Sequence, residues 1–167
     1  SILSLICVME DGASTETAVI GNDGMVGVTF FMGGEAASCQ TVVQNVGFAY
    51  RVKKNFLKQE FDRSSTVRNM LLRYALVLMN QIAQTAVCNR HHSVEQQLCR
   101  WLLSNLDRLR SNELIMTHEL IANTLGVRRE GITEAAGKLR NEGLIQYNRG
   151  HITVLDRKRL EKRSCEC

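Results

Sequence analysis

The fold is decided near the C-terminal end of the chain, where residues 117–155 read THELIANTLGVRREGITEAAGKLRNEGLIQYNRGHITVL. Thr117 is a residue type that caps helices, and the apolar residues after it predict a short helix over 118–124. Gly126 supplies the positive φ of a tight turn, because a residue without a Cβ adopts that conformation at little cost. A second helix follows over 129–142, so the order of elements predicts a helix-turn-helix.

A β-hairpin is predicted directly after the second helix. Gly143 ends that helix as a left-handed cap. Two short apolar stretches, 144–147 and 151–155, then flank a turn at 148–150. Apolar and polar residues alternate in the second stretch, as in a half-buried strand. A hairpin in this position predicts the wing of a winged helix-turn-helix.

The second helix of such a domain can enter the major groove of duplex DNA, where its N-terminal residues reach the base edges. The residues expected to read bases lie on the polar face, opposite Ile132 and Leu139, and are Arg129, Glu130, Thr133 and Glu134. The residues placed for phosphate contacts are Thr117, His118, Arg128 and Arg149. Winged helices also dock proteins, so a sensor or adaptor module that binds a protein is the alternative function.

The distribution of charge favours a polyanionic partner for the same end of the chain. Residues 1–89 hold seven Lys and Arg against seven Asp and Glu, whereas residues 90–167 hold 14 against 10. The whole net charge of +4 therefore comes from the C-terminal half. A basic surface there is consistent with DNA as the partner.

The N-terminal third has the pattern of a small β-structure. Apolar stretches over 2–9, 15–20, 26–32, 41–46 and 48–52 are separated by turns rich in Gly, Asn and Asp, which predicts short strands in a sandwich or barrel. A helical period begins near Lys54. A longer helix is predicted over 66–89, and a helix capped by Ser93 with Gln96 follows it.

The long helix has apolar residues on several sides. We expect one face to cover the β-structure and another to meet a second copy of the chain. The residues assigned to this dimer contact are Leu71, Tyr74, Leu78 and Ile82. A single buried core helix is the alternative interpretation.

The chain has six cysteines and no pair at C-x-x-C spacing. It is neither short nor dense in cysteine, so we expect reduced thiols in a cytoplasmic protein rather than disulfides. Cys165 and Cys167 could bind a metal or sense an oxidant, but a frayed terminus is the preferred interpretation. Adjacent residues such as His91 and His92 rarely face one site, so no metal site is predicted.

No motif indicates an enzyme or a membrane protein. Cys88 or Cys99 would need a fixed base and an oxyanion donor to act as a nucleophile, and the sequence identifies neither. No uninterrupted run of about 18 apolar residues is found, which is the length that a membrane span requires. We therefore expect neither catalysis nor contact with a membrane.

The motif from Thr117 through Arg129-Glu130 to the wing resembles the Crp/Fnr family of bacterial transcription regulators. The resemblance implies an α+β protein with a partial cyclic-nucleotide-binding-type β-roll over 1–62, a dimerisation helix over 63–90 and the winged helix-turn-helix over 91–167. The chain begins inside an expected strand and without a Met, so we also expect an N-terminal portion to be missing. The implied function is a homodimer that binds a roughly palindromic operator and contacts RNA polymerase, with residues 129–142 as the recognition helix.

Departures from the family pattern concern both halves of the chain. Glu134 stands where many members have an Arg that reads a base, and Arg128 replaces the usual Ser, so the half-site is expected to differ. In the β-roll, Gly34-Glu35 is followed by no Arg before Arg51, which leaves a phosphate without a charged partner. We therefore expect no cyclic nucleotide and no cofactor; an iron–sulfur cluster is not predicted, and haem is left open.

Overall fold

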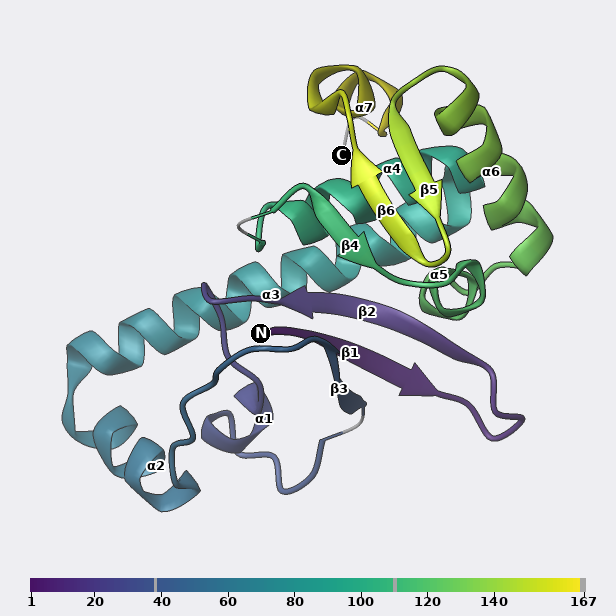
Figure 1. Cartoon of the computed structure of the whole chain (residues 1–167). Helices are drawn as coiled ribbons and strands as arrows, with labels where there is room; N and C mark the ends of the chain where they lie inside the picture. The colour runs from purple at the N-terminus through teal and green to yellow at the C-terminus, as the bar shows by residue number, and fades with distance from the viewer. Residues whose placement is uncertain (38, 110, 166–167) are drawn as a thin grey trace.

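The C-terminal half of the computed structural model is a winged helix-turn-helix. The structure describes residues 1–37, 39–109 and 111–165 of the chain. The elements of this half are α4 (Val94–Leu106), β4 (Glu113–Ile115), α5 (His118–Leu125), α6 (Arg129–Asn141), β5 (Ile145–Asn148), β6 (His151–Val154) and α7 (Arg157–Arg163). Figure 1 shows α4 at the centre of this half, with α5 and α6 on one side of it and the small sheet on another.

A single apolar core holds these elements together. The side chains of Leu98, Leu102, Ile121, Ile132 and Leu139 are all buried in it, and they come from α4, α5 and α6. The wing sheet has the strand order β4-β6-β5, with antiparallel pairing throughout. The sequence did not predict β4, because a three-residue strand is too short to show a period.

The N-terminal half contains an open antiparallel sheet and two helices that lead into a long third one. Its elements are β1 (Ile2–Val8), β2 (Ser14–Ile20), α1 (Val28–Phe31), β3 (Gln40–Asn45), α2 (Lys54–Arg63) and α3 (Ser65–His91). The strand order is β2-β1-β3. The predicted α+β class and the predicted long helix are both confirmed.

Two of the predicted strands are wrong. Residues 28–31 form α1, because Gly27 has a φ of 85° that turns the chain and lets Phe31 pack against Leu71 and Ala75 of α3. Residues 46–53 have no regular structure, and Phe48 and Tyr50 are fully exposed. Short apolar runs of this kind do not distinguish a strand from a buried helix, which is the physical reason for the first error.

The expectation of reduced thiols is also wrong for one pair of cysteines. Cys7 and Cys39 form a disulfide with a Cα–Cα distance of 4.4 Å. The cause is the register of β1 and β3, in which Ile6 pairs with Gln40 and thus sets the next two residues opposite each other. The predictions for Cys165 and Cys167, a frayed terminus or a metal- or oxidant-sensing pair, concern a segment that the structure describes only in part. Cys165 is buried, and Cys167 lies outside the described residues.

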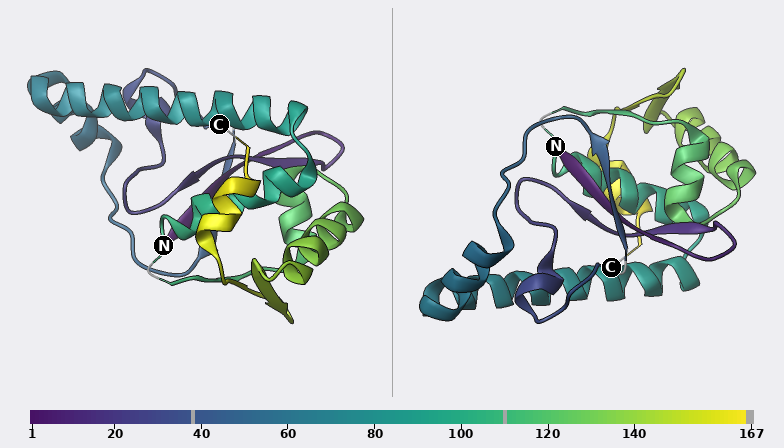
Figure 2. Two further views of the ribbon diagram at one scale, coloured as in Figure 1. Left: turned by 90° about the horizontal axis from the view of Figure 1, so that it is seen from above. Right: turned by 90° about the horizontal axis from the view of Figure 1, so that it is seen from below.

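The 27-residue helix α3 runs along both halves of the molecule (Figures 1 and 2). Ser64 caps its N-terminus, with the side-chain oxygen accepting from the Val67 amide. Leu71, Ala75 and Leu78 are the apolar residues of its middle turns that are buried against the rest of the chain. No helix among the described residues is long and apolar enough to cross a membrane.

Direct side-chain contacts join the two halves. The Trp101 indole of α4 donates to the Glu16 carboxyl of β2 over 3.1 Å. The β1–β2 hairpin also touches the helix-turn-helix, because a Cβ on Gly126 would come within 2.5 Å of the Thr15 hydroxyl. These contacts hold the N-terminal sheet against the turn of the motif.

Candidate nucleic-acid interface

The turn of the motif is built as the sequence predicts. The Thr117 hydroxyl accepts from the Leu120 amide over 3.2 Å and so caps α5. Gly126 ends α5 with a φ of 67° and a ψ of 33°, the left-handed conformation that favours glycine. Ala122 and Ala135 are both buried, so two small side chains lie in the core beside the turn. The local sequence thereby fixes the angle between α5 and α6.

Helix α6 exposes one polar face and buries the opposite one. Its buried residues are Ile132, Ala135, Ala136 and Leu139, spaced three and four apart. The residues predicted to read bases, Arg129, Glu130, Thr133 and Glu134, are all exposed. The helix therefore presents its first two turns to solvent, as an element that enters a DNA groove must.

The charges on this face are only partly neutralised by neighbours. Glu134 forms an ion pair with Lys138 over 2.8 Å, and this partner lowers the pKa of Glu134. Among the described residues, Arg128, Arg129 and Glu130 take part in no ion pair. The N-terminal end of α6 thus offers two guanidinium groups for a partner, while the carboxylate of Glu134 is already balanced.

His118 links α5 to α6 and to the wing. Its Nδ1 lies 3.1 Å from the Thr133 hydroxyl, which donates in turn to the Arg129 carbonyl. Its ring stacks on Tyr147 of β5, with 4.1 Å between ring centroids. Burial, and then the charge of Arg129, lower the pKa of His118. No local sequence pattern indicates this contact, and the phosphate contact expected of His118 stays a prediction.

The wing ends in a tight two-residue turn. Arg149 and Gly150 have φ values of 47° and 87°, so both have the positive φ that a type I′ hairpin requires. Arg149 is exposed at the tip of the wing, and the Gly150 carbonyl accepts from the Met116 amide over 2.6 Å. Arg128 before α6 and Arg149 on the wing are both exposed, and their contacts with phosphates stay a prediction.

The basic run 157–163 has a structural role in the fold. Arg157 is paired with Asp107 and with Glu161, and Arg163 bridges Glu95 and Glu142. These acids raise the pKa of both guanidinium groups. Leu160 of the same helix is fully buried. Helix α7 is therefore fixed to the domain, because Arg157 and Arg163 form ion pairs with acids of the same chain.

The dimer residues predicted on α3 differ in their surroundings. Leu71 and Leu78 are buried within the chain itself, and the Tyr74 hydroxyl contacts the Met25 backbone over 2.9 Å. Ile82 is 36% exposed. The dimer contact of these four residues stays a prediction. A different set of apolar residues on α3 faces solvent, and it includes Leu72, Leu76 and Met79.

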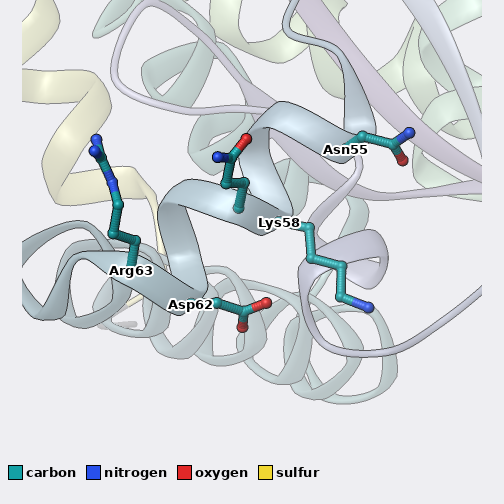
Figure 3. Close-up of a pocket in the computed structure, with 5 residues that line it drawn as sticks. Asn55, Lys58, Asp62 and Arg63 are labelled. Carbon is teal, nitrogen blue, oxygen red and sulfur yellow. The ribbon is translucent and has the colours of Figure 1, made fainter.

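A surface hollow on α2 does not resemble a ligand site. It measures about 580 Å³ and is lined by residues of α2 alone, namely Asn55, Lys58, Gln59, Asp62 and Arg63. Figure 3 shows the labelled side chains pointing away from one another. A binding pocket needs polar groups that converge on one point. The polar side chains that line this hollow do not converge.

The fold and this surface define the chain as a winged helix-turn-helix protein with a long helix between two halves. Residues 96–163 match the Crp-like helix-turn-helix domain family. The chain carries this domain within the fold of the Crp/Fnr family of transcriptional regulators, which confirms the resemblance seen in its sequence.

Solved structures with the same fold come from several bacteria. A Crp/Fnr family transcriptional regulator from Eubacterium rectale is 24% identical, with a TM-score of 0.76 over 97% of this chain and 76% of that one. A CRP family regulator from Thermus thermophilus has a TM-score of 0.80 at 16% identity, over 98% and 84%. FixK2 from Bradyrhizobium japonicum has a TM-score of 0.73 at 14% identity, over 100% and 85%. No curated protein sequence matches the chain.

Proposed function

We propose that the chain is a transcription regulator that binds duplex DNA as a homodimer, with α6 in the major groove. The observation that carries the proposal is the exposed N-terminal face of α6, where Arg129 and Glu130 have no ion-pair partner among the described residues. An arginine can bond O6 and N7 of guanine, and a glutamate can accept from N4 of cytosine. The exposed Arg128 and Arg149 supply phosphate contacts that fix the register.

A stripe of exposed apolar residues on α3 supports dimerisation. Leu72, Leu76 and Met79 are 44%, 58% and 59% exposed. Together with the exposed Ala83 and Ala86 they are spaced four, three, four and three residues apart. This is the 3.5-residue period that packs two parallel helices into a coiled coil. We therefore propose that the dimer contact on α3 includes this stripe, in addition to the residues predicted from the sequence.

The dimer proposal has a matched test. Leu76→Lys puts a charge in the stripe, whereas Val77→Lys puts the same charge at a position that is 61% exposed but lies outside the 3.5-residue period. Sedimentation velocity should show a dimer for the wild type and for Val77→Lys, and a monomer for Leu76→Lys. A monomeric wild type, or equal dissociation by both substitutions, would contradict this dimer contact.

The DNA proposal is tested by selection from a random duplex pool with the full-length chain. A two-fold symmetric dimer should enrich a roughly palindromic site whose half-sites lie about 34 Å apart, one helical turn of DNA. Binding to that site should weaken steeply with salt. A folded dimer that enriches no sequence would favour a winged helix that docks a protein instead.

Three further features belong to this proposal. A DNA-binding regulator of this kind acts in the cytoplasm, and the family likeness makes RNA polymerase a second partner. We also propose that the N-terminal half binds no cyclic nucleotide, because the chain between Gly34 and Arg51 supplies no arginine for a phosphate. Isothermal titration with cyclic AMP should give no heat of binding.

A further inference from the structure

Three side chains with metal-binding atoms converge where α3 meets the C-terminal end of the chain. Cys88 lies in the last turn of α3, His92 is the C-cap residue directly after that helix, and Cys165 follows α7, 77 residues after Cys88. Their donor atoms all lie within 4.8 Å of one another. The two sulfur atoms are 3.7 Å apart. The sequence pattern predicted no metal site, because this convergence arises only from the fold.

The fold holds the donors in this arrangement from both sides. His92 caps the C-terminus of α3 four residues after Cys88, about one helical turn further along, which brings the two residues close together. The His92 amide donates to the Cys88 carbonyl over 3.1 Å, and the His92 carbonyl accepts from the Gln97 side chain over 2.9 Å. On the other side, the ion pair between Arg163 and Glu95 anchors the end of α7 against α4.

The geometry fits a tetrahedral ion of the zinc class. With metal–sulfur bonds of about 2.3 Å, two thiolates on a tetrahedral ion lie about 3.8 Å apart, close to the observed separation of the sulfur atoms. A sulfur and an imidazole nitrogen on the same ion lie about 3.6 Å apart. The donors therefore need to move by only about 1 Å to close on one ion.

The chemistry of the cluster also favours a metal over a dithiol. The Nδ1 atom of His92 is buried and has no hydrogen-bond partner among the described residues, so it is an acceptor aimed into the protein. Cys88 is fully buried and Cys165 nearly so. Two thiolates and one imidazole are ligands that suit Zn²⁺, whereas a disulfide between the two sulfurs would leave the buried nitrogen unsatisfied.

We propose that Cys88, His92 and Cys165 form a binding site for a thiophilic divalent metal ion, of which Zn²⁺ is the representative. The bound ion fastens the end of α7 to the last turn of α3, so it stabilises the junction of the two halves. Binding releases the protons of the two thiols. The fourth position is taken by water.

The test uses the full-length chain, purified under reducing conditions and freed of metal with a chelator. Addition of Co²⁺ should produce the visible absorption of a tetrahedral ion together with a thiolate charge-transfer band, saturating at one equivalent per chain. Zn²⁺ should displace the Co²⁺. A hundredfold excess of free Zn²⁺ over its Kd should raise Tm by about 5–10 °C.

Matched variants separate the proposed ligands from their neighbours. Cys165→Ser and His92→Gln should weaken Co²⁺ binding at least tenfold. At a fixed Co²⁺ concentration, the charge-transfer band should weaken to the same extent as binding. His91→Gln and Cys99→Ala should keep both, because these residues lie outside the cluster. Cys88 is fully buried, so if Cys88→Ser does not fold, the other two ligand variants decide the question.

Two results would overturn the site. One is a spectrum and a Tm shift that His92→Gln and Cys165→Ser leave unchanged. The other is a Cys88–Cys165 disulfide, found by peptide mapping of the untreated protein, together with no binding of Co²⁺ or Zn²⁺ after its reduction. Neither result bears on DNA binding, so the metal site and the proposed function stand or fall separately.

Discussion

Glu16 links the two halves of the molecule through a buried carboxyl group, and replacing it with Gln should remove a pH dependence of stability. The side chain is only 6% exposed, and Trp101 and Gln44 donate to its two oxygens over 3.1 and 3.4 Å. Burial raises the pKa of Glu16 from 4.5 to about 7, against the opposing effects of the Trp101 bond and of nearby arginines. Gln is neutral at every pH and can accept the same indole hydrogen.

The raised pKa of Glu16 determines whether stability rises or falls with pH. Between pH 4.5 and about 7 the folded chain keeps a proton on Glu16 that the unfolded chain has released, so the free energy of unfolding falls as the pH rises through this range. Above pH 7 both states are ionised and the loss is complete. The difference between a pKa of 4.5 in the unfolded chain and of about 7 in the folded chain corresponds to about 3 kcal/mol.

The assay is urea denaturation of the wild type and of Glu16→Gln between pH 4 and pH 8.5. The difference in unfolding free energy between the two should change by about 3 kcal/mol across this range, with Gln gaining relative to Glu as the pH rises. Trp101 is the only tryptophan of the chain, so its fluorescence should also titrate near pH 7 in the wild type alone. Replacing the exposed Glu35 with Gln is the control.

A constant difference between wild type and Glu16→Gln over pH 4–8.5 would refute this reasoning. It would mean that the buried carboxyl group ionises at its ordinary pKa, with its charge solvated or paired in the folded state. A fluorescence midpoint that persists in Glu16→Gln would assign the titration to another group near Trp101.

Other substitutions test the DNA-binding half. Gly126→Ala should lower the unfolding free energy by about 1–2 kcal/mol, because alanine resists the left-handed conformation and its Cβ would meet Thr15. Gly137→Ala should raise it by about 1 kcal/mol, since the new Cβ would lie within 4 Å of no described atom beyond its chain neighbours and the adjacent backbone of α6; equal effects of these two in urea titrations would contradict the turn geometry. Ile132→Ala should cost about 2–5 kcal/mol by the same assay, and a cost below 1 kcal/mol would contradict its full burial. Arg149→Ala should reduce the slope of log K against log salt by about 1, and an unchanged slope would remove the wing tip from the phosphate contacts.

Local signals were enough to predict the helix-turn-helix and its wing. Thr117 as a cap, Gly126 in the turn and Gly143 at the end of α6 each act within a few residues of their place in the chain, and each lies where the sequence predicted. The exposed polar face of α6 could be predicted for the same reason, because the helical period alone decides which side of α6 carries the apolar residues.

Features that depend on distant pairing could not be predicted. The Cys7–Cys39 disulfide follows from a strand register, and the stacking of His118 on Tyr147 follows from the angle of the wing. The buried Glu16 is an isolated acid in an otherwise ordinary strand, and its partner Trp101 lies 85 residues away. No local period contains such information. The cluster of Cys88, His92 and Cys165 could not be predicted for the same reason, because Cys165 is far from the other two residues in the sequence.

Whether the N-terminal face of α6 reads base pairs can be decided by measuring the affinity of wild type and Arg129→Ala for the selected operator and for each of its single-base variants. Arg129→Ala should lose about 1–3 kcal/mol on the operator and lose discrimination at one base pair of each half-site. Lys158→Ala, a change on the exposed side of α7, should retain the wild-type pattern. Equal weakening on every variant sequence, with all base preferences kept, would show that Arg129 does not read a base.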